Sequence, residues 1–95
     1  MIIHIALFKW KKEANPEEID EIMNELRSLK KLDCVEDLYC GENFSKWANG
    51  YTHAIVGKFK DKESLEKYRK DPKHIPIAKK IEKLEADSIG IDFEA

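Results

Sequence analysis

A tyrosine and a histidine flank an interruption between two helical patterns in the second half of the chain. They are Tyr68 and His74, in the stretch YRKDPKHIPI. A phenol can donate a hydrogen bond to a developing oxyanion, and a neutral imidazole can take a proton from an acidic carbon or hydroxyl. This pair could therefore act on a carbonyl compound. A simple corner between helices, with its histidine on the surface, would use the same residues.

The interruption has a structural explanation that requires no function. Pro72 disfavours helical dihedral angles at Asp71, and Pro76 fits the first turn of a following helix. Asp71 is expected to cap a turn that leads into that helix. His74 would then lie at the positive end of the helix dipole, which favours a neutral imidazole and hence a role as a base.

Two further histidines, His4 and His53, fall on predicted strands. Each shares its strand face with an aromatic side chain, Phe8 in the first case and Phe59 in the second. If the strands are neighbours, the imidazoles form a polar floor in an apolar pocket, which is typical of small-molecule sites. The alternative is a pair of buried histidines with local hydrogen bonds. Three histidines can also hold zinc, but their spacings of 49 and 21 residues match no metal motif, so no metal is predicted.

Apolar periodicity and capping residues predict the elements that position these side chains. Asn15 and Pro16 are typical of a helix start, since asparagine caps and proline suits the first helical position. Asp61 is a second capping residue, ahead of a helix with Leu65 and Tyr68 on its inner side. The predicted strands are residues 2–10, 34–41, 50–59 and 88–94, and the predicted helices are about 16–31, the segment between Asp61 and Pro72, and 77–86.

The order β-α-β-β-α-α-β is the split β-α-β pattern of ferredoxin-like folds, with its second helix broken in two. The predicted class is α+β, with one antiparallel four-stranded sheet and the helices on one face. The first and third strands are adjacent in this topology, which would bring His4 and His53 near each other. The first strand is apolar on both faces, with Ile3, Ile5 and Leu7 pointing away from His4. We therefore expect a second subunit to cover the far face of the sheet.

Length and charge limit the possible classes of protein. The chain has 95 residues, which predicts one domain over 1–95, and dimerisation would help so small a core. The net charge is −2, but residues 13–42 hold ten acidic and three basic residues, and residues 58–83 hold ten basic and five acidic. These segments are two solvated helix faces or complementary surfaces in an assembly. Nucleic-acid binding is disfavoured, because the acidic half would repel phosphate.

Neither the N-terminus nor the cysteines indicate export. No apolar run approaches the ~18 residues that would span a bilayer. The start, MIIHIALFKWKK, is apolar first and basic afterwards, the reverse of a secretory signal. We therefore expect folded structure from residue 1, a cytoplasmic location and no membrane partner. On one extended strand Cys34 and Cys40 would lie ~20 Å apart, too far for a disulfide, which predicts two reduced thiols.

Several stretches together resemble one family along the whole chain. They are MIIHIALFKWK, GENFS, GYTHAIVGKF, LEKYRKDPKH and the terminal IDFE. At these spacings the chain resembles the stress-responsive A/B barrel domain, the dimeric alpha–beta barrel family called Dabb. The resemblance implies a ferredoxin-like subunit and a homodimer whose sheets join back to back into a barrel. Its best understood branch is similar to a plant polyketide (olivetolic acid) cyclase, which uses no cofactor, so none is expected here.

That branch implies roles for particular residues. Its working tyrosine and histidine, the latter a base, match Tyr68 and His74. Its two strand histidines match His4 and His53, so the resemblance implies that all three histidines line one pocket. Asp71 replaces a histidine of the family's corner motif and could raise the basicity of His74 from the edge of that pocket. Gly57 also departs from the family, where a larger residue faces inward, and its absence of a side chain would enlarge the pocket, unless Phe8 refills the space.

Three hypotheses of function follow. The first is a homodimer that binds a small, mostly apolar carbonyl or aromatic compound, and it requires His53 and His74 to face one cavity. Its pocket would be lined by His4, Phe8, His53, Ile55, Tyr68 and His74. The second is a cofactor-independent cyclase or lyase with His74 as base and Tyr68 as oxyanion donor. The third is a stress-associated interaction module without a ligand, which the absence of a pocket beside His74 would favour.

Overall fold

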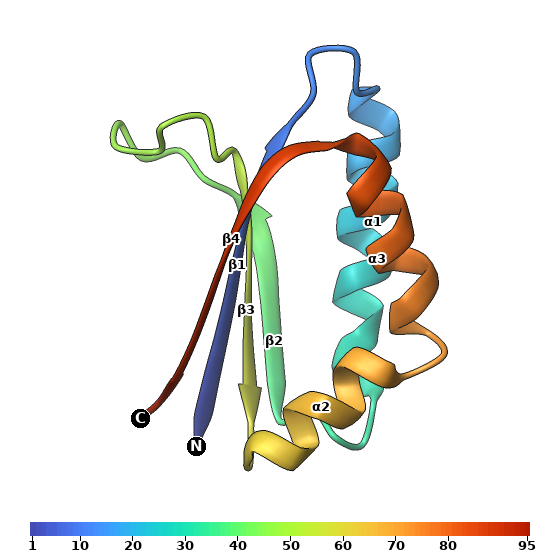
Figure 1. Ribbon diagram of the computed structural model, residues 1–95, viewed down its shortest axis with the longest axis vertical. Coiled ribbons are helices and arrows are strands. Elements are labelled where there is room, and N and C mark those ends of the chain that lie inside the picture. Colours follow the sequence, from blue (N-terminus) through green and yellow to red (C-terminus); the bar gives the residue numbers. More distant parts are fainter.

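The computed structural model describes residues 1–95 as a four-stranded sheet with three α-helices on one side (Figure 1). The sheet is antiparallel, in the order β2-β3-β1-β4. This is the predicted ferredoxin-like α+β fold, with the second helix broken in two. The strands are β1 (Ile2–Trp10), β2 (Asp37–Glu42), β3 (His53–Phe59) and β4 (Glu85–Glu94), and the helices are α1 (Pro16–Ser28), α2 (Lys62–Lys70) and α3 (His74–Leu84), with a 3-10 turn at Leu29–Lys31.

Two capped helix starts agree with the sequence. The Asn15 side chain accepts a hydrogen bond from the Glu17 amide at 2.9 Å at the start of α1. The Asp61 side chain accepts from the Ser64 amide at 2.8 Å at the start of α2. Each cap satisfies an amide that has no partner within the helix.

No helix of the structure has both the length and the apolar composition to cross a membrane.

Several element boundaries differ from the predictions: β3 begins at His53 rather than at residue 50, β4 begins at Glu85 rather than at residue 88, and α3 ends at Leu84 rather than at residue 86. Two further differences have a clear local cause. β2 begins at Asp37 rather than at residue 34, because Val35 closes a backbone turn by donating to the Leu32 carbonyl. Cys34 therefore lies in that turn and does not share a strand with Cys40; both thiols are free. α3 begins at His74 rather than at residue 77, because the Asp71 carbonyl already accepts hydrogen bonds from the next turn of backbone.

The core lies between the sheet and the helices. Its most completely buried side chains are Tyr68, Phe59, Ile22, Leu26, Leu29 and Ile55. A side chain at Gly57 would not fit, since a Cβ there would lie 2.7 Å from the Phe59 ring. The expectation that Gly57 enlarges a pocket is therefore wrong, because the Phe59 ring, and not Phe8, occupies the space above it. The Phe59 ring in turn packs against His4 and Tyr68, with ring centroids 6.3 and 5.1 Å away.

The opposite face of the sheet has no helix over it (Figure 1), and it carries several large apolar side chains. We call it the open face. It carries alternate residues of all four strands, and its large exposed members are Tyr39, Ile89, Ile91 and Phe93. Residues 43–52, which join β2 to β3, project on this same side, away from the helices.

On the helical side, Lys80 on α3 pairs with Glu25 on α1 at 2.7 Å, so the two oppositely charged segments meet within one layer.

Candidate functional site

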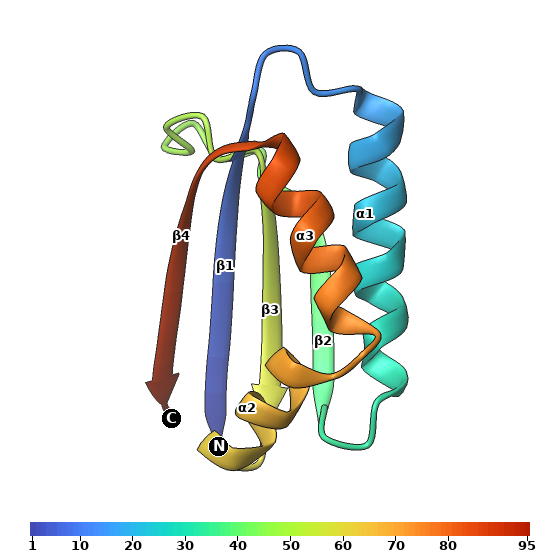
Figure 2. The ribbon, with the colours of Figure 1, turned by 45° about the vertical axis from the view of Figure 1, so that its right-hand side comes forward.

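A small cavity lies where the break between α2 and α3 faces the centre of the sheet (the helices are seen over the strands in Figure 2). Its volume is about 230 Å³. The lining residues are His4, Ala6, Phe8, Leu26, Ile55, Tyr68, Arg69, His74, Ala78, Ile81 and Glu82. Five of the predicted site residues are therefore brought together, from two strands (β1 and β3) and two helices (α2 and α3): His4, Phe8, Ile55, Tyr68 and His74.

His74 is placed as the first residue of α3, with its ring 4.5 Å from that of Tyr68. Its Nδ1 lies 3.2 Å from the Arg69 carbonyl oxygen. A carbonyl can only accept, so Nδ1 carries the proton and Nε2 is left with a free lone pair. Burial lowers the pKa of His74, although the bond to the Arg69 carbonyl opposes this. The ring is therefore neutral near pH 7, with Nε2 available as an acceptor.

Tyr68 supplies a phenol from the inner side of α2. The residue is only 1% exposed, and burial raises the pKa of its hydroxyl. The hydroxyl makes no hydrogen bond with the protein, yet no fully enclosed side-chain polar atom lacks a partner. The hydroxyl is therefore at least slightly accessible, and Tyr68 lines the cavity. It is a protonated donor without an acceptor.

His4 is held from behind by a carboxylate on the neighbouring strand. Asp92 lies directly opposite His4 in the pairing of β1 with β4, and its Oδ1 is 2.6 Å from His4 Nδ1. Its Oδ2 accepts from Arg69 Nη2, also at 2.6 Å. Partial burial raises the pKa of Asp92, but the bonds from His4 and Arg69 outweigh this and lower it. An ionised carboxylate only accepts, so His4 carries a proton on Nδ1.

Asp92 and Arg69 are site residues that the sequence predictions missed. A signal for Asp92 existed in the terminal IDFE stretch, where it alternates with Ile91 and Phe93 and so faces the helices. Its position opposite His4 depends on strand register, which the sequence does not specify. Arg69 follows Tyr68 on a charged helix, and nothing marks it out among the lysines around it.

His53 lies in a different environment. It pairs with Phe8 across β1 and β3, whereas His4 pairs with Gly57. The two histidines are thus four positions apart along the sheet, or ~13 Å. The stacked rings of Phe8 and Trp10, 5.4 Å apart, stand on β1 beyond His4. The prediction that all three histidines line one cavity is therefore wrong for His53, and the three-histidine zinc site is not formed.

The surroundings of His53 fix the tautomer of its neutral ring that is opposite to that of His74. Trp10 Nε1, which can only donate, points to His53 Nδ1 at 2.9 Å. Nδ1 is therefore the acceptor, and the proton of the neutral ring lies on Nε2. Burial lowers the pKa of His53. The ring faces a separate hollow of about 240 Å³ lined by Asp20, Met23, Asn24, Arg27, Gly41, Glu42 and His53.

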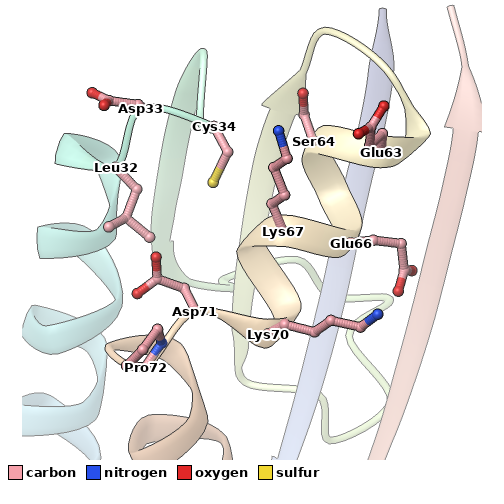
Figure 3. Close-up of a pocket in the computed structure, with 10 residues that line it drawn as sticks. All are labelled: Leu32, Asp33, Cys34, Glu63, Ser64, Glu66, Lys67, Lys70, Asp71 and Pro72. Carbon is pink, nitrogen blue, oxygen red and sulfur yellow. The ribbon is translucent and has the colours of Figure 1, made fainter.

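Asp71 caps the turn and does not contact the His74 ring. Its side chain accepts from the Lys73 amide at 2.8 Å, and its carbonyl accepts from the amides of His74 and Ile75. The carboxylate faces a third hollow, between α2 and the turn that holds Cys34 (Figure 3). The prediction that Asp71 lines the histidine pocket is therefore wrong, because its side chain and carbonyl bond to the backbone of the turn. Its charge does act to raise the pKa of His74, in the predicted direction, but burial outweighs this effect and lowers that pKa.

That third hollow is the largest in the molecule, at about 790 Å³. Its walls are mostly charged or polar, with Glu63, Glu66, Lys67 and Lys70 along α2 (Figure 3). Small-molecule sites are mainly apolar with a few converging polar groups. The smaller cavity beside His74 has that character, and the largest hollow does not. We therefore place the candidate site at the smaller cavity.

The comparisons with known proteins identify the family. Residues 2–95 match the family described as the Stress responsive A/B Barrel Domain, or Dabb. The chain belongs to this family. A curated relative, the stress-response A/B barrel domain-containing protein DABB1 of Arabidopsis thaliana, is 28% identical over 99 residues. The match covers 100% of this chain but 47% of that relative, so the chain spans about half of its length.

Solved structures share the fold at low sequence identity. A dimeric ferredoxin-like protein of unknown function from Thermobifida fusca superposes with a TM-score of 0.88 at 23% identity, covering 99% of this chain and 90% of that one. A hydroxynitrile lyase from Passiflora edulis gives a TM-score of 0.87 at 18% identity, covering 97% and 90%. These similarities establish the ferredoxin-like fold of the subunit.

Proposed function

We propose that this protein binds a small, mostly apolar carbonyl or aromatic compound in the cavity beside Tyr68 and His74. One observation carries the proposal: the rings of Tyr68 and His74, 4.5 Å apart, line one cavity with His4, and most of its other lining residues are apolar. Polar groups without partners in such a space are costly unless a ligand or water satisfies them. The predicted form of this hypothesis required His53 and His74 to face one cavity, and that form fails, because the two residues line separate hollows. The proposal is a revised one, in which the pocket lacks His53 and Asp71.

The size of the cavity limits the ligand. An apolar cavity of roughly 150 Å³ can hold benzene, and this one measures about 230 Å³. A single ring with one or two substituents fits that volume. Tyr68 would donate to the carbonyl oxygen of the ligand, and a hydroxyl or acidic C–H of the ligand would face Nε2 of His74.

A ligand screen tests the binding proposal. We expect weak but specific binding of substituted benzaldehydes, acetophenones or phenols, measured by ligand-observed NMR on the full chain. Ala78→Phe would fill the cavity and remove the signal. Lys79→Phe adds the same ring at the next, exposed position of α3 and should leave the signal intact. Equal binding in both variants, or none in the wild type, would contradict the proposal, provided that circular dichroism shows both variants folded.

A second candidate function is catalysis of proton transfer next to a carbonyl. His74 Nε2 would take the α-proton of a bound ketone or aldehyde, and Tyr68 would donate to the resulting enolate oxygen. The protonated His74 would then return the proton to the product. Support comes from the free Nε2 next to a phenol donor, and from the shared fold of the Passiflora edulis lyase, which at 18% identity supports the scaffold alone. Exchange of α-protons for deuterium, followed by NMR, tests this step.

We further propose that the chain is a homodimer joined through the open face, as the dimeric description of the Thermobifida fusca protein suggests. Apolar residues on that face have no cover within the chain. Ile91→Lys should make the protein monomeric in analytical ultracentrifugation.

The hypothesis of an interaction module without a ligand is disfavoured, because a cavity lies beside His74. The cytoplasmic location stays a prediction.

A further inference from the structure

Two aromatic side chains stand fully in solvent on the segment between β2 and β3. Phe44 is 100% exposed and Trp47 is 77% exposed. We call residues 43–52 the aromatic loop. It includes most of the GENFS stretch that carries part of the family resemblance, and no residue of the loop lines the candidate site.

The aromatic loop is rigidly built. The Asn43 side chain donates to the Tyr51 carbonyl at 2.9 Å and accepts from the Ser45 amide at 3.1 Å. The Ser45 hydroxyl in turn accepts from the Trp47 amide at 3.0 Å. Asn49 and Gly50 turn the chain back with φ of 52° and 87°. A loop ordered in this way has already lost its conformational entropy, so presenting Phe44 and Trp47 to a partner costs little more.

The loop projects on the side of the open face (Figure 1). Tyr51 ties its base to β4 through a 2.5 Å hydrogen bond to Asp87. Any body that covers Ile89, Ile91 and Phe93 would therefore also meet this loop. An aromatic side chain buries ~150–250 Å², and a stable interface buries ~800 Å² on each partner. Two such side chains would supply a large part of the area that a dimer needs.

We propose that Phe44 and Trp47 are the anchors of the homodimer and pack against the second copy of the chain. This rests on the homodimer proposed above. Asn43 and Ser45 hold the two rings in position. A membrane surface is the weaker partner for this loop, because Lys46 is the only cation within it, and at its base the charge of Lys9, which lies 4.6 Å from the Tyr51 ring, is opposed by Glu42 and Asp87.

Sedimentation equilibrium on the full chain tests the proposal. The variant Phe44→Ser/Trp47→Ser should raise the dimer dissociation constant by about 100-fold or more, as expected for two central aromatic anchors. Ile75→Ser is the matched control, since Ile75 is also exposed, at 41%, but lies on α3 in the helical layer. Its dissociation constant should equal that of the wild type.

Fluorescence supplies an independent readout. Trp47 should be shielded from acrylamide in the dimer and become quenchable on dilution, and Trp47→Phe should remove this change and leave the Trp10 signal. Asn43→Ala should weaken the dimer without removing apolar area.

The outcomes separate the two proposals. An unchanged dissociation constant in the double variant, or a Trp47 that stays quenchable in the dimer, overturns the anchor proposal and leaves the homodimer intact. A wild type that is monomeric at all concentrations overturns both. Flotation with phosphatidylserine vesicles that depends on Phe44 and Trp47, with dimerisation unaffected, would assign the loop to a membrane surface and overturn the anchor proposal.

Discussion

The environments of His74 and His53, both on the helical side of the sheet, share a lowered imidazole pKa and differ in the partner of Nδ1. At His74 and at His53, burial lowers the pKa of the imidazole, so both rings are neutral near pH 7. At His53, Trp10 donates to Nδ1, which leaves the proton on Nε2. At His74, a backbone carbonyl accepts from Nδ1, which leaves the lone pair on Nε2. Burial therefore does not decide which histidine can act as a base; the partner of the second nitrogen does.

Matched substitutions at the two histidines should give the largest difference. If the cavity catalyses enolisation, His74→Gln should lower the rate of deuterium exchange into acetophenone by about 10²–10⁴-fold, since a general base contributes that much. His53→Gln should leave the rate within a few-fold, because Nε2 of His53 is a donor in a separate hollow. NMR of the ketone methyl signal measures both rates. Equal losses of exchange rate in the two variants would show that His74 is not the base and that the two histidines do not differ in function.

The next largest effect should be the loss of stability on removing Trp10, which donates to Nδ1 of His53. Trp10→Phe leaves Nδ1 of His53 without its indole partner and should reduce the free energy of unfolding by about 1–2 kcal/mol. The Thr52 hydroxyl also lies 2.9 Å from this nitrogen, so Thr52→Ala should cost less. Urea denaturation measures both changes. A larger loss in Thr52→Ala than in Trp10→Phe would show that the indole is not the controlling donor.

Removing the charge of Asp92, the carboxylate that bonds to His4, should have a smaller effect on the free energy of unfolding, and this effect should depend on pH. The pKa of Asp92 is lowered in the folded state, so its stabilising contribution is present above the unfolded pKa of ~3.9 and is lost as the pH falls through the folded value. Asp92→Asn should cost about 0.5–1 kcal/mol at pH 7, because the side chain is partly exposed. The difference from the wild type should shrink as the pH falls below ~3.9. A constant difference across this range would show that charge is not the cause.

The tautomers themselves are the most direct test, although the energies involved are small. Long-range ¹H–¹⁵N NMR at pH 7.5 should show Nδ1–H at His4 and His74 and Nε2–H at His53. Because the folded pKa values of His53 and His74 are lowered, the unfolded chain binds protons first, and stability should fall as the pH drops below ~6.5. The same tautomer at all three rings would contradict the assignment.

The sequence was informative about strand faces and less so about positions along the strands. Alternation correctly assigned His4, Phe8 and Ile55 to the helical face, because side chains of a strand alternate strictly. It could not place His53 relative to His4, since a ten-residue loop between β2 and β3 leaves the register open. For the same reason Asp92 could be put on the correct face but not opposite His4.

The corner between α2 and α3 was predicted in outline. The prolines and Asp71 specified a capped turn, and His74 falls at the start of the next helix as expected. The role of Asp71 toward His74 depended on where its two oxygens find donors, and the nearest donor is the backbone of its own turn. Local hydrogen bonding of this kind competes with longer contacts and is hard to rank from residue types alone.

Strand β4 serves both regions that the proposals concern. It follows α3 without a connecting residue. On one face its Asp92 bonds to His4 and Arg69, which line the cavity, and on the other face it presents Ile89, Ile91 and Phe93. A ligand that moved Asp92 would therefore move the surface offered to a second subunit. Thermodynamic linkage makes such an effect reciprocal: the factor by which a ligand tightens the dimer equals the factor by which dimerisation tightens the ligand.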